Sequence, residues 1–222
     1  MNFDEWVGEF FQVLDEEKMT PKQKQILLAA VEVFAEKGYA GTSTSEIAKK
    51  AGVAEGTIFR HYKTKKELLL SIVAPVVAKL VAPFVIENIR KVIDQDFPSY
   101  EDFLRALIKN RIEFLRSHFR VIKIFMQEIP FHDELKEQFQ HYVAENVLVR
   151  FQSIVSHFQD RGELIDLPAI SIIRHTASVI GGLLIARFLI VPDAEWEEEQ
   201  VIEETIQMLL YGIKAKEKYS RC

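Results

Sequence analysis

Apolar residues recur three and four positions apart along most of this 222-residue chain, the spacing of one face of an α-helix. Proline and glycine divide the pattern into segments, and the strict alternation expected of a half-buried strand does not occur. The pattern predicts helices over residues 3–16, 21–37, 44–51, 54–62, 65–93, 100–117, 119–129, 131–161, 168–190 and 195–216. We therefore expect an all-α chain of nine or ten helices, in which the first four form a small module.

Residues 44–62 have the pattern of a helix-turn-helix, two short helices joined by a tight turn. Gly52 falls in the turn, where a positive φ is needed. Helical spacing points one set of residues inward, namely Ile47, Ala48, Ala51, Val53, Ile58 and Tyr62. The same spacing points Ala54, Glu55, Thr57, Arg60 and His61 outward, with Phe59 at the edge. Thr42, Ser43 or Thr44 can cap the first helix of the pair.

The outward face suits the major groove of DNA, which admits one α-helix. Thr57 can bond to a base edge or meet a thymine methyl group. Arg60 and His61 can donate hydrogen bonds to bases or phosphates, and Phe59 can lie against the sugar–phosphate backbone.

Charge is unevenly distributed along the chain. The whole chain carries a net charge of −5, yet residues 42–66 hold six basic residues and two acidic ones. Lys65 and Lys66 begin the next helix, where backbone N–H groups also favour phosphate. Glu55 would repel phosphate but can accept a hydrogen bond from a cytosine amino group. The alternative is a helical hairpin with a solvated basic face.

The stretch from Ile26 to Leu69 reads ILLAAVEVFAEKGYAGTSTSEIAKKAGVAEGTIFRHYKTKKELL. It resembles, almost continuously, the DNA-binding domain of the TetR family of bacterial transcriptional regulators. The resemblance implies a DNA-binding domain followed by a ligand-binding and dimerising domain. It implies DNA contacts at Thr42, Ser43, Thr44, Ala54, Glu55, Gly56, Thr57, Phe59, Arg60, His61, Lys65 and Lys66.

The chain accordingly divides into three segments. They are an amphipathic N-terminal extension at residues 1–19, a helix-turn-helix DNA-binding domain at 20–66, and a helical ligand-binding and dimerisation domain at 67–222. We expect the acidic extension to pack on the DNA-binding domain or on a partner subunit; competition with DNA for the basic face is the other option. Pro75 and Pro83 would kink the helix after the DNA-binding domain. We expect ligand binding to move that helix and thereby to change the separation of the two DNA-binding domains of a dimer.

By the same resemblance, the helices at 168–190 and 195–216 pair with their twofold mates in a four-helix bundle. Small and apolar residues suited to this contact are Ser178, Gly181, Gly182, Ile185, Ile206, Leu209 and Leu210. The alternative is that these helices are buried within one chain. The apolar run at 177–191 contains Arg187 and is shorter than the roughly 20 residues of a membrane span, so we expect no membrane contact.

The middle helices are rich in aromatic residues, most of which we expect in the core. The resemblance implies that some line an effector pocket, and our candidates are Phe103, Leu107, Arg111, Phe114, Phe125, Tyr142 and Arg174. Apolar walls with a few polar groups favour a small apolar ligand, with an anionic group as a further option.

An enzyme is the main alternative class. The sequence has no Gly-rich phosphate loop, HExxH motif, clustered Cys and His metal set or nucleophile motif. The triplet His132-Asp133-Glu134 stands at a helix start, where the helix dipole favours acids. We therefore expect no catalysis, no cofactor and no metal. A helical adaptor that had lost DNA binding would show a degraded recognition helix, and this one is intact.

These observations predict a bacterial transcription regulator, a homodimer that binds double-stranded DNA at a pseudo-palindromic operator. The single cysteine, Cys222, can form no internal disulfide, which suits the cytoplasm. A ligand-responsive repressor is the form that we expect. Repressor and activator both stay open, as do the operator, the effector and the regulated genes.

Overall fold

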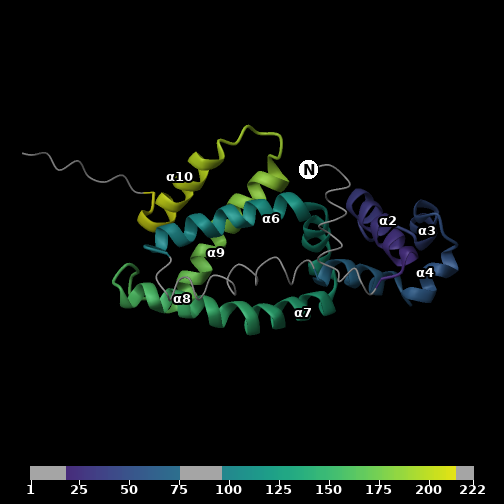
Figure 1. Cartoon of the computed structure of the whole chain (residues 1–222), viewed down its shortest axis with the longest axis horizontal. Coiled ribbons are helices and arrows are strands. Elements are labelled where there is room, and N and C mark those ends of the chain that lie inside the picture. The colour runs from purple at the N-terminus through teal and green to yellow at the C-terminus, as the bar shows by residue number, and fades with distance from the viewer. Residues whose placement is uncertain (1–18, 76–96, 214–222) are drawn as a thin grey trace, which may run out of the picture. The chain divides into compact units, whose positions relative to one another are not determined.

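The computed structural model describes residues 19–75 and 97–213, and the regular elements of these two ranges are all helical (Figure 1). They are α2 (Pro21–Lys37), α3 (Thr44–Ala51), α4 (Glu55–His61), a helix at residues 65–75, α6 (Tyr100–Glu128), η2 (Ile129–Phe131), α7 (Asp133–Val143), η3 (Ala144–Leu148), α8 (Val149–Asp160), α9 (Ala169–Ile185), η4 (Ala186–Ile190) and α10 (Glu198–Tyr211). The all-α prediction is confirmed for this part of the chain. The predicted helix at 3–16 and the predicted kink at Pro83 lie outside the described residues.

Local sequence signals set both ends of α2. The Thr20 hydroxyl accepts a hydrogen bond from the Gln23 amide at 3.3 Å, while the Gln23 side chain accepts one from the Thr20 amide at 2.9 Å. Pro21 occupies the first turn, where its missing N–H leaves no helical hydrogen bond unmade. Gly38 ends the helix with a φ of +74°. The helix start at Pro21 and the glycine stop are therefore confirmed.

Several predicted helix boundaries are wrong. α6 is one helix where the sequence suggested two, because no proline or glycine interrupts it. The helix predicted at 131–161 starts later, since Pro130 opens a 3-10 turn, and it contains a wider π turn, η3. α10 is shorter than predicted at both ends, and Gly212 stops it with a φ of +74°.

Packing divides the described residues into two compact units, the first with residues 19–75 and 111–150 and the second with 97–110 and 151–213. In the first unit, one apolar cluster joins α2, α3, α4 and the helix at 65–75 to the second half of α6 and the start of α7. The helix-turn-helix is thus part of a larger packed unit. The division into segments 1–19, 20–66 and 67–222 stays a prediction.

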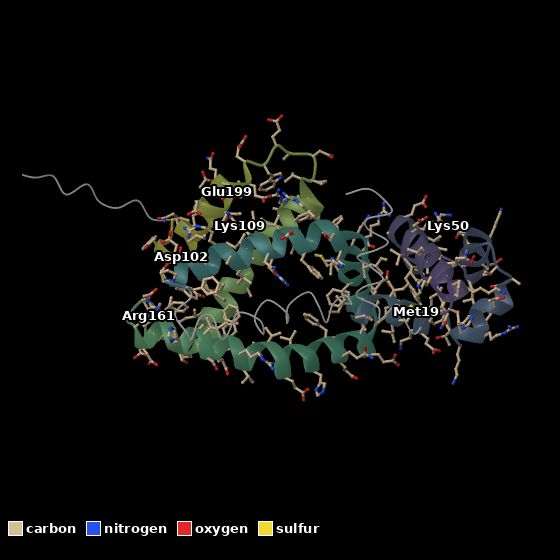
Figure 2. The ribbon with its side chains drawn as sticks, viewed as in Figure 1. Met19, Lys50, Asp102, Lys109, Arg161 and Glu199 are labelled. Atoms are coloured by element: carbon tan, nitrogen blue, oxygen red, sulfur yellow. The ribbon has the colours of Figure 1, made fainter. Side chains whose placement is uncertain are left out.

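The second unit combines the first turns of α6 with α8, α9 and α10. Tyr100 of α6 packs edge-on against Phe158 of α8, with 5.2 Å between the ring centroids. Two salt bridges join α6 to α10, Arg105–Glu203 at 2.5 Å and Lys109–Glu199 at 2.8 Å, and Figure 2 labels the second pair. These contacts fix α10 on α6 with charged groups at the surface.

The helical run Ala169–Ile190, formed by α9 and η4, is long and apolar enough to cross a membrane by length and composition. This helical run is longer than the apolar run at 177–191 noted in the sequence, because the helix already begins at Ala169. Only 22% of its most apolar window is buried. Ile170, Ile185 and Ile190 are among its exposed side chains. The second unit therefore presents a broad apolar surface on this run.

Candidate nucleic-acid interface

The turn between α3 and α4 has the predicted geometry. Gly52 adopts a φ of +67° and a ψ of +31°, in the left-handed region. The Val53 amide donates to the Ala48 carbonyl oxygen at 3.0 Å, which closes the turn. The inner face comprises the buried Ile47, Ala48, Ile58 and Tyr62 with the half-buried Ala51 and Val53. The predicted inner face of the helix-turn-helix is therefore confirmed.

The opposite face of α4 is open to solvent. Its exposed residues, with the preceding cap, are Ala54, Glu55, Gly56, Phe59 and Arg60, while Thr57 and His61 are half-buried. A Cβ atom added at Gly56 would meet no atom within 4 Å, so internal packing does not require glycine there. Phe59 is 47% exposed, which is high for a large aromatic residue. This face offers little side-chain bulk at one end and an aromatic ring and a guanidinium at the other.

Ser43 is the cap of α3, because its hydroxyl accepts a hydrogen bond from the Glu46 amide at 3.1 Å. Thr44 instead donates its hydroxyl to Glu55 Oε1 at 2.5 Å, which joins the start of α3 to the start of α4. The carboxylate of Glu55 is thereby oriented before any partner binds. Glu46 also pairs with Lys37, and the hydrogen bond from this lysine lowers the pKa of Glu46.

Thr42 and Lys65 face inward, although the sequence placed both among the DNA contacts. Thr42 is 3% exposed, and its hydroxyl donates to the Gly38 carbonyl oxygen at 2.7 Å. Lys65 Nζ donates to the carbonyl oxygens of Tyr39 and Thr42, each at 2.7 Å, and lies 4.2 Å from the centroid of the Tyr39 ring. Both side chains therefore support the loop at residues 38–42, and their direct DNA contacts stay predictions.

A polar junction holds the same loop from the end of α6 and from the residue that precedes α7. The Tyr39 amide donates to Glu128 Oε1 at 3.3 Å, and the Tyr39 ring packs edge-on against His132 with centroids 4.9 Å apart. His132 Nε2 lies 3.3 Å from Glu128 Oε2, and these side chains are 13% and 12% exposed. Burial, and then the charge of Glu128, raise the pKa of the Tyr39 phenol. We call Tyr39, Glu128 and His132 the loop junction; spacing gives no sign of it, because Tyr39 lies far from the other two in sequence.

Three cations stand at the surface of the helix-turn-helix. Lys49, Arg60 and Lys63 are exposed, and none of their side chains makes a hydrogen bond or ion pair within the described ranges. Lys50 pairs with Glu32 at 2.6 Å, and Lys66 pairs with Glu134 at 3.0 Å. The basic window of the sequence is therefore divided between internal partners and a smaller set of solvent-facing charges.

The seven candidate ligand residues are divided between the two units. Phe103 and Leu107 are buried in the second unit, Arg111, Phe114 and Phe125 belong to the first, Tyr142 lies in α7 with a side chain outside the described set, and Arg174 is exposed on α9. In the first unit the Phe114 ring stacks on His118, with centroids 4.3 Å apart. A single pocket lined by all seven residues stays a prediction.

The predicted dimer residues differ in exposure. Ser178, Gly182 and Ile185 are exposed, and Gly181, Leu209 and Leu210 are half-buried. Ile206 is fully buried within the chain, so we correct its assignment from interface to core. Across the described ranges, no group of three or more His, Cys, Asp or Glu side chains could hold a metal ion.

Comparison with known proteins gives a family match that includes the helix-turn-helix. Residues 26–72 match the family described as bacterial regulatory proteins, tetR family. The chain is 54% identical over 52 residues to the fatty acid metabolism regulator protein of Bacillus subtilis (strain 168), covering 23% of this chain and 27% of that relative. It is 29% identical over 144 residues to the uncharacterized HTH-type transcriptional regulator YerO of the same organism, covering 63% and 48%. The chain thus spans about a quarter to a half of the length of these relatives.

Solved structures share the fold over most of the chain. The fatty acid degradation regulator FadR of Bacillus halodurans has a TM-score of 0.64 at 23% identity, covering 90% of this chain and 100% of that one. The transcriptional regulator FadR of Bacillus subtilis, solved in complex with stearoyl-CoA, has a TM-score of 0.61 at 23% identity, covering 86% and 98%. At these identities the likeness shows the fold alone.

Proposed function

Because the chain belongs to the TetR family of bacterial transcriptional regulators, we propose that it is a cytoplasmic, ligand-responsive repressor that binds operator DNA as a homodimer. The observation that carries this proposal is the α3–α4 pair, in which a packed inner face holds an open outer face on α4. A single helix of this kind fits the major groove. We propose no catalytic role, in keeping with relatives that are named as regulators.

Four residues of α4 have a direct role in this proposal. Arg60 donates to guanine or to phosphate, and Thr57 meets a base edge or a thymine methyl group. Phe59 lies along the sugar–phosphate backbone. Glu55, oriented by Thr44, accepts a hydrogen bond from a cytosine amino group. The small residues at the start of α4 allow the helix to approach the floor of the groove.

Binding to promoter and intergenic fragments, in competition with random DNA, tests the proposal. We expect a specific complex at least ~10³-fold tighter than the complex with random DNA. Arg60→Gln should weaken the specific complex by about 1–3 kcal/mol. Lys136→Gln, which changes an exposed lysine on α7, should leave it unchanged. Equal affinity of the wild-type protein for all fragments would refute sequence-specific DNA binding.

The homodimer is proposed from the apolar surface of α9 and α10. Ile185, Met208 and Tyr211 are 42%, 48% and 62% exposed, and Gly182 is exposed among them. A second copy would bury this surface, and its twofold axis would present two α4 helices to successive half-sites. Sedimentation should give a dimer for the wild type and a monomer for Ile185→Asp. A wild type that stays monomeric at micromolar concentration would contradict the dimer.

The effector is proposed to be an amphipathic acyl compound. Similar proteins are named for fatty acid metabolism or degradation, and one structure of such a protein holds stearoyl-CoA. Phe103 and Leu107, on the part of α6 that belongs to the second unit, give that unit buried apolar surface suited to an acyl chain. Stearoyl-CoA should therefore release the specific DNA complex of a repressor. Tighter DNA binding would indicate an activator, and unchanged DNA affinity would refute this effector class.

We propose that effector binding changes the position of the α3–α4 pair through the loop junction. Glu128 ends α6 and accepts from Tyr39, whose loop leads directly to the cap of α3. A shift of α6 would therefore displace the α3–α4 pair. This connection is proposed in addition to the one predicted from the sequence, which runs through Pro75 and the helix at 65–75.

Glu128→Gln tests the route because it removes the carboxylate charge and keeps the side-chain shape. Ligand-free DNA affinity should stay within about twofold, while stearoyl-CoA should release less DNA than it does from the wild type. Glu137→Gln, an exposed change on α7, is the matched control. Identical release curves for Glu128→Gln and wild type would rule out the junction as the route.

A further inference from the structure

The second unit contains a half-enclosed cavity of about 470 Å³. It lies between the start of α6, the loop after α8, the first half of α9 and the end of α10. Its volume is within the range of small-molecule sites, roughly 300–1,000 Å³. The apolar walls are formed by Leu164, Ile165, Leu167, Ile172, Leu209 and Tyr211. Among the candidate ligand residues whose side chains the structure describes, Arg174 is the one that lines this cavity.

The loop after α8 is fixed in a form that presents apolar side chains. Gln159 Nε2 donates to the carbonyl oxygens of Ile165 and Leu167, at 2.9 and 2.8 Å. The Glu163 amide donates to the Phe158 carbonyl oxygen at 3.0 Å. Ile165 and Leu167 are nevertheless 68% and 47% exposed. A loop held by these bonds keeps two large apolar side chains in solvent beside the cavity, which favours contact with an apolar ligand.

A neutral polar pair forms part of the cavity lining. The Tyr100 hydroxyl and the Thr176 hydroxyl lie 3.2 Å apart, and both side chains are buried. Burial raises the pKa of Tyr100 to about 12, so this phenol keeps its proton at neutral pH. The Tyr100 amide donates to Glu163 Oε2 at 2.8 Å, which holds the loop against the start of α6. The hydroxyl pair of the lining is therefore uncharged and already hydrogen-bonded.

Arg174 supplies a cation at the cavity that has no internal partner among the described residues. Glu163 pairs with Arg161 at 2.8 Å, whereas Glu101 shares Arg105 with Asp102 and Glu203. Arg174 is exposed on α9 and makes no hydrogen bond or ion pair with any described residue. The neighbouring His175 likewise lines the cavity and has no such partner within the described ranges. Arg174 thus offers an unpaired guanidinium at an apolar cavity, and this group can pair with a carboxylate.

We propose that this cavity binds an amphipathic carboxylate, a compound with an apolar chain that ends in one carboxylate. The chain lies against Ile172 and the loop side chains Ile165 and Leu167. The carboxylate pairs with the Arg174 guanidinium, which can donate two parallel hydrogen bonds to it. His175 supplies a second polar contact at the same end. The binding needs no DNA, so it can be tested independently of operator recognition.

Calorimetric titration of the full chain with decanoate, and with decanol as the neutral analogue, tests the proposal. The wild type should bind one decanoate per chain. Arg174→Gln should weaken decanoate binding at least tenfold and leave decanol binding unchanged, because only the carboxylate uses the guanidinium. Ile172→Trp should abolish binding of both compounds by filling the cavity. Arg116→Gln, an exposed arginine on α6 in the first unit, is the matched control and should bind decanoate as the wild type does.

Two results would overturn the proposal. One is equal decanoate affinity for wild type, Arg174→Gln and Ile172→Trp, which would place the carboxylate elsewhere. The other is the absence of decanoate binding to the wild-type protein. Circular dichroism of each variant shows whether it is folded, and decanol binding by Arg174→Gln provides an internal check of the cavity. DNA binding of the wild type would remain to be judged by its own assay.

Discussion

Replacement of Lys65 by methionine tests the structural role assigned to this lysine. Its ammonium donates to two carbonyl oxygens, of Tyr39 and Thr42, and lies over the Tyr39 ring. Methionine keeps an unbranched apolar stem of similar length and removes the charge and all three donors. The two carbonyl groups would then need water or a rearranged loop to replace their hydrogen bonds.

The expected loss follows from these contacts. A hydrogen bond from a charged donor contributes about 1.5–3 kcal/mol net, and a cation–π contact at a partly exposed site adds about 0.5–1 kcal/mol. The two bonds share one ammonium and are not additive, so we expect Lys65→Met to lower the free energy of unfolding by about 2–4 kcal/mol. That is a large part of the roughly 5–15 kcal/mol that stabilises a domain.

Urea unfolding at fixed protein concentration, followed by circular dichroism, measures this loss. Lys63→Met is the matched control, since Lys63 is an exposed lysine two positions away whose ammonium makes no bond to the described residues and whose backbone bond to Glu67 the substitution keeps. Its loss should change stability by less than about 0.5 kcal/mol. DNA affinity should also fall for Lys65→Met, because the loop that carries the cap of α3 loses support. A Lys65→Met protein as stable as Lys63→Met would refute the assigned role.

Three further outcomes can be measured on the same protein. Gly52→Ala should lower the free energy of unfolding by about 1–2 kcal/mol, because the added Cβ has open space and only the left-handed backbone opposes it; a change under 0.3 kcal/mol in urea unfolding would contradict this. Glu203→Gln should cost about 0.5–1 kcal/mol at pH 7. Since the hydrogen bond from Arg105 lowers the pKa of Glu203, that contribution exists above the unfolded carboxyl pKa and is lost as pH falls through the lower folded pKa, so a pH series of thermal melts should converge in acid. Thr44→Val should relax the base preference at one position in each half-site of selected DNA, and an unchanged preference would show that Thr44 does not orient Glu55.

The sequence predicted the helix-turn-helix well because its signals are local. Apolar spacing within α3 and α4 gave the inner face, and Gly52 marked a turn that needs a positive φ. A packing contact between residues three or four positions apart can be recognised from the sequence alone. The exposed side of α4 followed from the same periodicity.

Contacts between distant segments could not be predicted in this way. The bond from Tyr39 to Glu128 joins α6 to a loop that lies far away in sequence, and nothing in either segment marks it. For the same reason the sequence assigned Lys65 to DNA, because its charge is visible but the two carbonyl oxygens that it contacts are not. Helical spacing also cannot say whether an apolar stripe meets its own chain or another, which is why Ile206 was assigned to the interface and is buried in the core.

Selection of DNA from a random pool by the wild-type protein, followed by footprinting of the selected sequences, tests the central claim most directly. If α4 reads the major groove in a twofold pair, the selected sites should share an inverted repeat, with half-sites separated by about 10 base pairs or a multiple of that spacing. The footprint should cover both half-sites and be lost with Arg60→Gln. Selected sequences with no common motif, or a single unrepeated motif that Arg60→Gln binds equally well, would contradict the claim.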